Sequence, residues 1–171
     1  MPIKKTRILT LVILQVIILF LFASCSNSSF RTYENENLQY TIDYPESWSM
    51  ETIPDPLALE PAVVLIAPSP QIGQVGISVI EDSEFPPQQV AGGTEKTLER
   101  ILQDFVIVKE GKTEHWDWHF EGRGTNDKGD IYAFGYYKQK ANYIYKIQGM
   151  VDAKIWDDLL IDKIISSFKL L

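Results

Sequence analysis

The stretch Ile131-Tyr132-Ala133-Phe134-Gly135-Tyr136-Tyr137 is apolar on both sides of an extended chain. Successive side chains of a strand point to opposite faces of a sheet. Ile131, Ala133 and Tyr137 therefore lie on one face, and Tyr132, Phe134 and Tyr136 lie on the other. A strand of this kind is buried on both sides. We expect a sheet with helices or loops packed on each of its faces.

Strand patterns recur on both sides of this stretch, and short links rich in Gly, Pro, Asn and Asp separate them. They cover residues 38–44, 63–67, 76–80, 105–109, 115–124, 131–139 and 143–150. The prolines between Ile53 and Pro61 predict an irregular connection there. Because the links are short, successive strands are expected to pair antiparallel.

Two segments have helical spacing instead. Apolar residues recur at helical intervals between Glu84 and Phe105, and Gly92-Gly93 predicts that the firm part of this helix begins at Thr94. Asp152 is a suitable N-cap for a closing helix. The predicted class is therefore α+β, with a central antiparallel sheet of about six strands flanked by helices.

Residues 1–24 have the pattern of a secretory signal peptide, with a basic start followed by the apolar run Ile8–Ala23. A retained membrane span is the alternative, but a span needs about 20 predominantly apolar residues. This run is shorter and contains Gln15. The end of the run, Leu21-Phe22-Ala23-Ser24-Cys25, resembles the lipobox of bacterial lipoproteins, in which the cysteine is acylated and becomes the mature N-terminus.

Cys25 is the only cysteine, so the chain can form no internal disulfide. An ordinary signal peptide followed by a free thiol is the alternative to lipidation. A lone exposed cysteine in an oxidising compartment can pair only between molecules, and acylation by palmitate or similar chains removes that liability. We expect residues 25–32 to form a lipidated tether and residues 33–171 a single domain. The membrane would hold this domain on its extracytoplasmic side, in the periplasm, at the cell surface or in the thylakoid lumen.

The net charge of the chain limits the classes of partner that it is expected to bind. Loss of residues 1–24 would move the formal net charge from −7 to −10, because it removes three basic residues and no acidic one. Affinity for nucleic acid depends largely on Lys and Arg at phosphates, so nucleic acid is not expected as a partner. Electrostatic docking on anionic lipid is disfavoured for the same reason. The acyl chains are expected to supply the membrane contact.

The segment Tyr40-Thr41-Ile42-Asp43-Tyr44-Pro45-Glu46-Ser47-Trp48 resembles the opening of PsbP-like domains. The ending at Ile165-Ser166-Ser167-Phe168 is similar to the end of that family, and the resemblance runs from about Tyr33 to Leu171. It implies an α/β/α sandwich. The family includes extrinsic subunits and assembly factors of photosystem II, and its cyanobacterial members are lipoproteins. It supplies no catalytic residue to carry over, and the long N-terminal arm of the plant subunits has no counterpart here.

The stretch His115-Trp116-Asp117-Trp118-His119-Phe120-Glu121 contains both histidines of the chain. Strand alternation would place Trp116, Trp118 and Phe120 on one face and the polar residues on the other. Neighbours on one face are about 7 Å apart, so His115 with Asp117, or Asp117 with His119, could share a zinc or copper ion. The alternative is a solvent-exposed face over a tryptophan-rich core face.

These observations favour a non-enzymatic binding domain that docks on, or assists the assembly of, a membrane protein complex. That complex would be photosystem II if the source is photosynthetic. The alternative is a lipoprotein that binds a metal ion or a small ligand through the His115–Glu121 face. An enzyme is disfavoured because the sequence lacks a Gly-x-Ser-x-Gly nucleophile elbow and a phosphate-binding loop.

Overall fold

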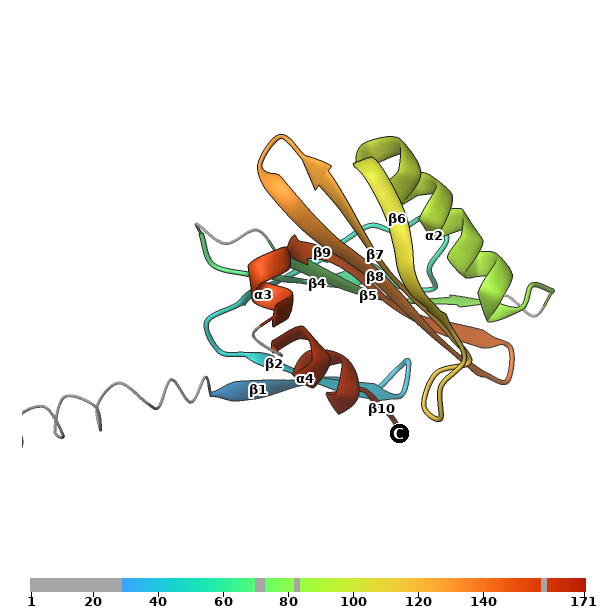
Figure 1. Ribbon diagram of the computed structural model, residues 1–171. Helices are drawn as coiled ribbons and strands as arrows, with labels where there is room; N and C mark the ends of the chain where they lie inside the picture. The colour runs from blue at the N-terminus through green and yellow to red at the C-terminus, as the bar shows by residue number, and fades with distance from the viewer. Residues whose placement is uncertain (1–28, 70–72, 82–83, 158–159) are drawn as a thin grey trace, which may run out of the picture.

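The computed structural model describes residues 29–69, 73–81, 84–157 and 160–171. Its elements follow the order shown in Figure 1. They are β1 (Phe30–Asn35), β2 (Tyr40–Pro45), β3 (Ser49–Ile53), β4 (Ala62–Ile66), β5 (Gly73–Glu81), α2 (Pro87–Ile101), β6 (Gln103–Gly111), β7 (Trp118–Asn126), β8 (Gly129–Lys140), β9 (Tyr143–Asp152), α3 (Ala153–Asp157), α4 (Leu160–Ser167) and β10 (Lys169–Leu170).

The strands form two antiparallel sheets. The larger sheet has seven strands in the order β3-β4-β5-β9-β8-β7-β6, and the smaller one has the order β1-β2-β10. The predicted α+β class with an antiparallel sheet and flanking helices is confirmed. The central sheet has seven strands, close to the expected number of about six, and the small sheet is an addition that was not expected. The first hairpin of the chain leaves the main sheet because β2 pairs with β10 at the other end of the described chain.

The large sheet is buried on both faces, as the sequence of β8 predicts. Tyr132, Phe134 and Tyr136 belong to one apolar cluster. Ile131, Ala133 and Tyr137 belong to the cluster on the other face. The small sheet, α3 and α4 cover the first face, whereas α2 packs against β6, β7 and β8 on the second (Figure 1).

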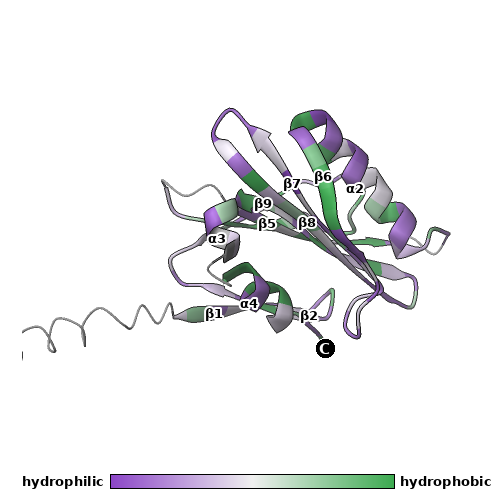
Figure 2. Cartoon of the chain, viewed as in Figure 1, coloured by the Kyte–Doolittle hydropathy of each residue, from purple (hydrophilic) through white to green (hydrophobic). Residues whose placement is uncertain are grey.

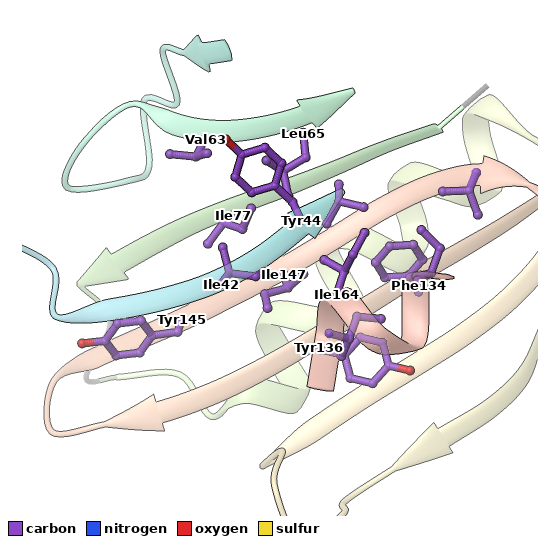
Figure 3. Close-up of a cluster of buried hydrophobic side chains, with 14 of the residues drawn as sticks. Ile42, Tyr44, Val63, Leu65, Ile77, Phe134, Tyr136, Tyr145, Ile147 and Ile164 are labelled. Atoms are coloured by element: carbon purple, nitrogen blue, oxygen red, sulfur yellow. The ribbon is translucent and has the colours of Figure 1, made fainter. Parts of the chain in front are cut away.

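The first cluster joins the two sheets into one core. Ile42 of the small sheet lies beside Ile147 of the large one, and Tyr44 points toward Val63 and Leu65 (Figure 3). These side chains are at most 9% exposed. Burial of apolar side chains of this size stabilises a fold by about 1.5–3 kcal/mol each.

Helix α2 starts earlier than predicted. It begins at Pro87, where the fixed φ of proline suits the first helical turn. The glycines at 92 and 93 lie inside the helix, so the expectation that its firm part begins at Thr94 is wrong. The helix ends at Ile101, and Phe105, where the helical pattern ended and the predicted strand 105–109 began, lies in β6.

The closing helix forms as two pieces, α3 and α4. Asp152 caps the first, because its Oδ1 accepts the backbone N–H of Lys154 at 2.9 Å. On α4, the three isoleucines Ile161, Ile164 and Ile165 are buried. The helix also carries polar residues, and Figure 2 shows both kinds along it.

Within the part of the chain that the structure describes, no helix is long and apolar enough to cross a membrane. The predicted signal peptide and Cys25 lie outside the described residues.

Candidate functional site

A tight loop of residues 112–117 precedes β7. The Thr113 hydroxyl accepts the backbone N–H groups of His115 at 3.3 Å and Trp116 at 3.0 Å. The Thr113 N–H in turn donates to the Trp116 carbonyl at 3.0 Å. A threonine hydroxyl that binds nearby backbone in this way competes with strand pairing. Strand β7 therefore begins only at Trp118.

This loop changes the side to which Trp116 points. Trp116 joins the first apolar cluster, whereas Phe120 and Trp118 belong to the cluster on the opposite face. The expectation that Trp116, Trp118 and Phe120 share one face is wrong. Strand alternation does not extend back through the loop, and it holds only from Trp118 onward.

The loop and the C-terminal end of the described chain enclose a cleft of about 610 Å³. Trp116 lines it from the loop, Ile165 from α4, Leu170 from β10, and Phe168 from between α4 and β10. The rings of Trp116 and Phe168 lie 5.4 Å apart at 30°. Figure 1 shows the β6–β7 loop beside β10 at one end of the molecule. The cleft therefore has an aromatic and aliphatic floor.

Charged side chains of both signs form the rim. Glu114, Lys138, Asp162 and Lys169 all line the cleft. The Lys138 ammonium lies 3.9 Å from Asp117, which also accepts the Gln139 N–H at 2.8 Å. Burial and the nearby charge of Glu121 raise the pKa of Asp162 above its ordinary value.

A buried carboxylate stands on the same face of the large sheet. Glu121 Oε1 accepts hydrogen bonds from the Tyr136 hydroxyl at 2.7 Å and the Lys109 ammonium at 3.0 Å. Its Oε2 accepts from the Tyr132 hydroxyl at 3.1 Å. Burial alone would raise the pKa of Glu121. The hydrogen bonds from Tyr136, Lys109 and Tyr132, with the charge of Lys109, outweigh it and hold this pKa below its ordinary value.

The structure separates the predicted metal ligands. His115 is exposed and lines the cleft, Asp117 pairs with Lys138, and His119 is only 3% exposed. The Nδ1 atom of His119 lies 2.8 Å from the Gly111 carbonyl, and because that oxygen only accepts, Nδ1 donates.

Nε2 of His119 is buried without a hydrogen-bond partner among the described groups. In that same set of residues, no three His, Cys, Asp or Glu side chains are placed to hold a metal ion. The zinc or copper site stays a prediction.

His119 and Glu121 also do not form the solvent-exposed face considered for this stretch. Glu121 is 6% exposed, and the His119 ring stacks on Tyr136 at 5.4 Å. Sequence reasoning missed Lys109, Tyr132 and Tyr136 as partners of Glu121. The signal available in the sequence was the crowding of tyrosines in β8. Strand alternation by itself predicts that such tyrosines pack in the core, not that they donate hydrogen bonds to Glu121.

The two sheets and their helices define a Mog1/PsbP-like fold, which confirms the resemblance read from Tyr40–Trp48 at the level of the fold. The solution structure of cyanobacterial PsbP, CyanoP, from Synechocystis matches with a TM-score of 0.63 and 15% identity. The match covers 86% of this chain and 98% of CyanoP.

The Ran-binding protein Mog1p from Saccharomyces cerevisiae matches with a TM-score of 0.56 and 10% identity, over 84% of this chain and 96% of Mog1p. LpqN, involved in cell envelope biogenesis of Mycobacterium tuberculosis, matches with a TM-score of 0.50 and 12% identity, over 82% and 91%. No protein-family model and no curated protein matches the sequence.

Proposed function

We propose that this protein is a lipid-anchored, non-enzymatic binding domain outside the cytoplasm that docks on a membrane protein complex through the cleft. The observation that carries the proposal is the cleft itself, with its aromatic floor and its rim of both charges. The likeness to CyanoP over most of both chains supports it at the level of the fold. In a photosynthetic source the complex would be photosystem II or an assembly intermediate.

The position of the cleft suits a protein held at its N-terminus. β1 begins at Phe30, which pairs with Pro45, and the other end of this hairpin is the pair Asn35 and Tyr40. Leu170, which lines the cleft, pairs with Tyr40. The length of β1, about 17 Å at roughly 3.3 Å per residue, thus separates the chain entry from the cleft. An anchor at Cys25 would therefore join the domain at the end of β1 that lies away from the cleft.

The composition of the cleft suits a protein partner. Aromatic side chains are enriched in the cores of protein interfaces, and polar groups surround them at the rim. Trp116 and Phe168 supply the first feature, and Glu114, Lys138 and Lys169 supply the second. The acyl anchor adds to the affinity because it confines the domain to the membrane plane and raises its effective concentration near membrane partners.

The test is an affinity pull-down from native membranes in mild detergent, with the full-length protein as bait. We expect the lipidated protein to recover a defined membrane complex, and Cys25→Ser to recover much less. Lys169→Glu, at an exposed rim position, should reduce recovery, whereas Lys128→Glu in the exposed β7–β8 turn should not. An empty pull-down with the anchor confirmed by mass spectrometry would contradict docking.

The cleft also favours a second candidate, the binding of a small ligand beside His115. Its volume of about 610 Å³ lies in the range of small-molecule pockets, and its apolar floor of four side chains is surrounded by six polar or charged ones. Native mass spectrometry of the protein purified from its own membranes would reveal a retained ligand. A ligand lost in Lys169→Glu but kept in Lys128→Glu would support this candidate over docking.

A further inference from the structure

The two edges of the large sheet differ. β6, at one edge, has register shifts between Gln103 and Val106 and between Ile107 and Lys109. Asp104 in the first of these shifts has a φ of 51°. Bulges of this kind twist an edge strand and hinder the pairing of another strand with it. The β6 edge is thus protected against strand addition.

β3, at the other edge, lacks these protections. Its register with β4 is unbroken from Ser49 to Ile53. All five of its residues are exposed, and none is Pro or Lys. Within the described part of the chain, β3 pairs with β4 alone. Its outer backbone groups are therefore available to pair with another extended chain.

Apolar side chains flank this edge on both faces. Met50, opposite Leu65, is 42% exposed. Ile53, opposite Ala62, is 46% exposed and points to the other face, because the two residues are three positions apart in the strand. A strand added to β3 would find an apolar contact for side chains on either of its faces.

The charge near β3 is of one sign. Between Thr32 and Glu95 the chain has eleven Asp and Glu residues and no Lys, Arg or His. Residues 96–171 instead have twelve acidic and twelve basic residues. All of β3, β4 and β5 lies in the first of these segments. The charged residues within β3, β4 and β5 are Glu51 and Glu81, both acidic, and the loop that joins β3 to β4 adds Asp55 and Glu60.

Among the described residues, two cations form ion pairs with acidic residues of this segment, and one of them, Arg31, lies 3.8 Å from Glu46. Asp55, which follows β3, lies 3.8 Å from the Lys146 ammonium. Glu60 accepts hydrogen bonds from the uncharged amides of Asn35 and Asn37, both at 3.1 Å. Glu51, at the centre of β3, is exposed and in no ion pair with a described residue. An extended segment with basic residues would complement this edge, and an acidic one would be repelled.

We propose that the free edge of β3 binds an extended basic segment of a partner protein by strand addition. Backbone hydrogen bonds to β3 supply the register, contacts with Met50 and Ile53 add apolar burial, and basic side chains meet Glu51. Peptides that add to a sheet edge obtain affinity from the main chain and specificity from alternate side chains. This inference rests on the sheet edge alone and is independent of the cleft.

The probe is a labelled heptapeptide of alternating lysine and valine, titrated by fluorescence anisotropy into the full-length protein in non-ionic detergent. We expect binding that weakens as salt is raised. Glu51→Lys should weaken it at least tenfold, since it reverses the charge of the exposed strand centre. Glu110→Lys, on the exposed part of the β6 edge, should leave it unchanged. A peptide with glutamate in place of lysine, or with proline in place of the central valine, should not bind.

Amide hydrogen exchange is a second measurement, and it distinguishes strand addition from non-specific electrostatic binding of the peptide. On peptide binding, amides within residues 49–53 should exchange more slowly, while those of β6 should not change. The proposal is overturned if the lysine-valine peptide fails to bind, if Glu51→Lys binds it as well as the wild type, or if β3 gains no protection. It is also overturned if sedimentation shows a homodimer in which residues 49–53 are already protected without peptide, because β3 would then pair with a second copy.

Discussion

The Tyr136 hydroxyl on β8 donates a 2.7 Å hydrogen bond to Glu121 Oε1 on β7, although the two residues are not opposite each other in the ladder. Glu121 is opposite Phe134, and Tyr136 is opposite His119. The bond therefore runs diagonally across the strand pair, within reach of a long aromatic side chain. It gives the buried carboxylate a donor that no directly opposite residue supplies.

Removal of this donor should destabilise the fold. We expect Tyr136→Phe to lower the free energy of unfolding by about 1.5–3 kcal/mol, the usual range for a hydrogen bond to a charged group. Tyr143→Phe, at a ring that is 39% exposed, is the matched control and should change it by less than about 0.5 kcal/mol. Urea denaturation at pH 7 measures both. Equal effects of the two substitutions would show that the bond contributes nothing.

The carboxylate of Glu121 should make the free energy of unfolding depend on pH. The pKa of Glu121 is lowered in the folded protein, while the pKa of glutamate in an unfolded chain is about 4.3. The contribution of Glu121 is therefore fully present above about pH 4.3 and is lost as the pH falls through the lower folded pKa. We expect Glu121→Gln to be less stable than the wild type at pH 7 and to lose less stability on acidification. Parallel stability curves between pH 7 and pH 3 would contradict this.

Local patterns predicted the parts of the fold that depend on local sequence. The two apolar faces of β8 follow from the alternation of Ile131–Tyr137. The cap at Asp152 and the irregular connection after Ile53 follow from side-chain chemistry and from proline. The small sheet did not follow, because it requires β10 to meet β2 from more than 120 residues away in the chain.

The candidate site was less predictable for two reasons, one local and one long-range. A single hydroxyl, that of Thr113, ends the alternation before Trp118, and no periodicity in the sequence signals it. The burial of Glu121 depends on partners from β6 and β8, Lys109 and Tyr136 among them. Sequence reasoning therefore found the residues of the 115–121 stretch but placed Trp116 on the wrong face.

Ionisation of Asp162 should affect stability in the opposite direction to ionisation of Glu121. Burial and the charge of Glu121 raise its pKa, and the charge of Lys109 only partly opposes them. Its ionised form therefore costs stability at neutral pH, and that cost begins to fall once the pH drops below the raised folded pKa and is gone below the unfolded pKa.

We expect Asp162→Asn to be more stable than the wild type at pH 7, by less than about 1 kcal/mol because solvent screens this exposed side chain. The difference should vanish below about pH 4, where an unfolded aspartate is also protonated. Asp127→Asn in the exposed β7–β8 turn is the control. Thermal unfolding at pH 7 and pH 4 distinguishes the variants, and a destabilised Asp162→Asn at pH 7 would contradict the prediction.

Two glycines should respond in opposite directions to the same substitution. A Cβ at Gly149 in β9 would collide with the Gln74 carbonyl of the neighbouring strand and would lie 2.7 Å from Phe134 Cζ. The backbone in the middle of a paired sheet has little room to move. We therefore expect Gly149→Ala to lower the free energy of unfolding by about 1–3 kcal/mol or more. At Gly92 in α2, an added Cβ meets nothing within 4 Å.

Gly92→Ala should therefore stabilise the protein by about 0.5–1 kcal/mol, because alanine loses less backbone freedom in a helix. Chemical denaturation of the two variants beside the wild type measures both changes. If α2 frayed ahead of Thr94, Gly92→Ala would have almost no effect, since position 92 would not be helical. A stabilisation of the expected size would place Gly92 inside a formed helix. A Gly149→Ala variant as stable as the wild type would contradict the close approach of β5 and Phe134 to β9.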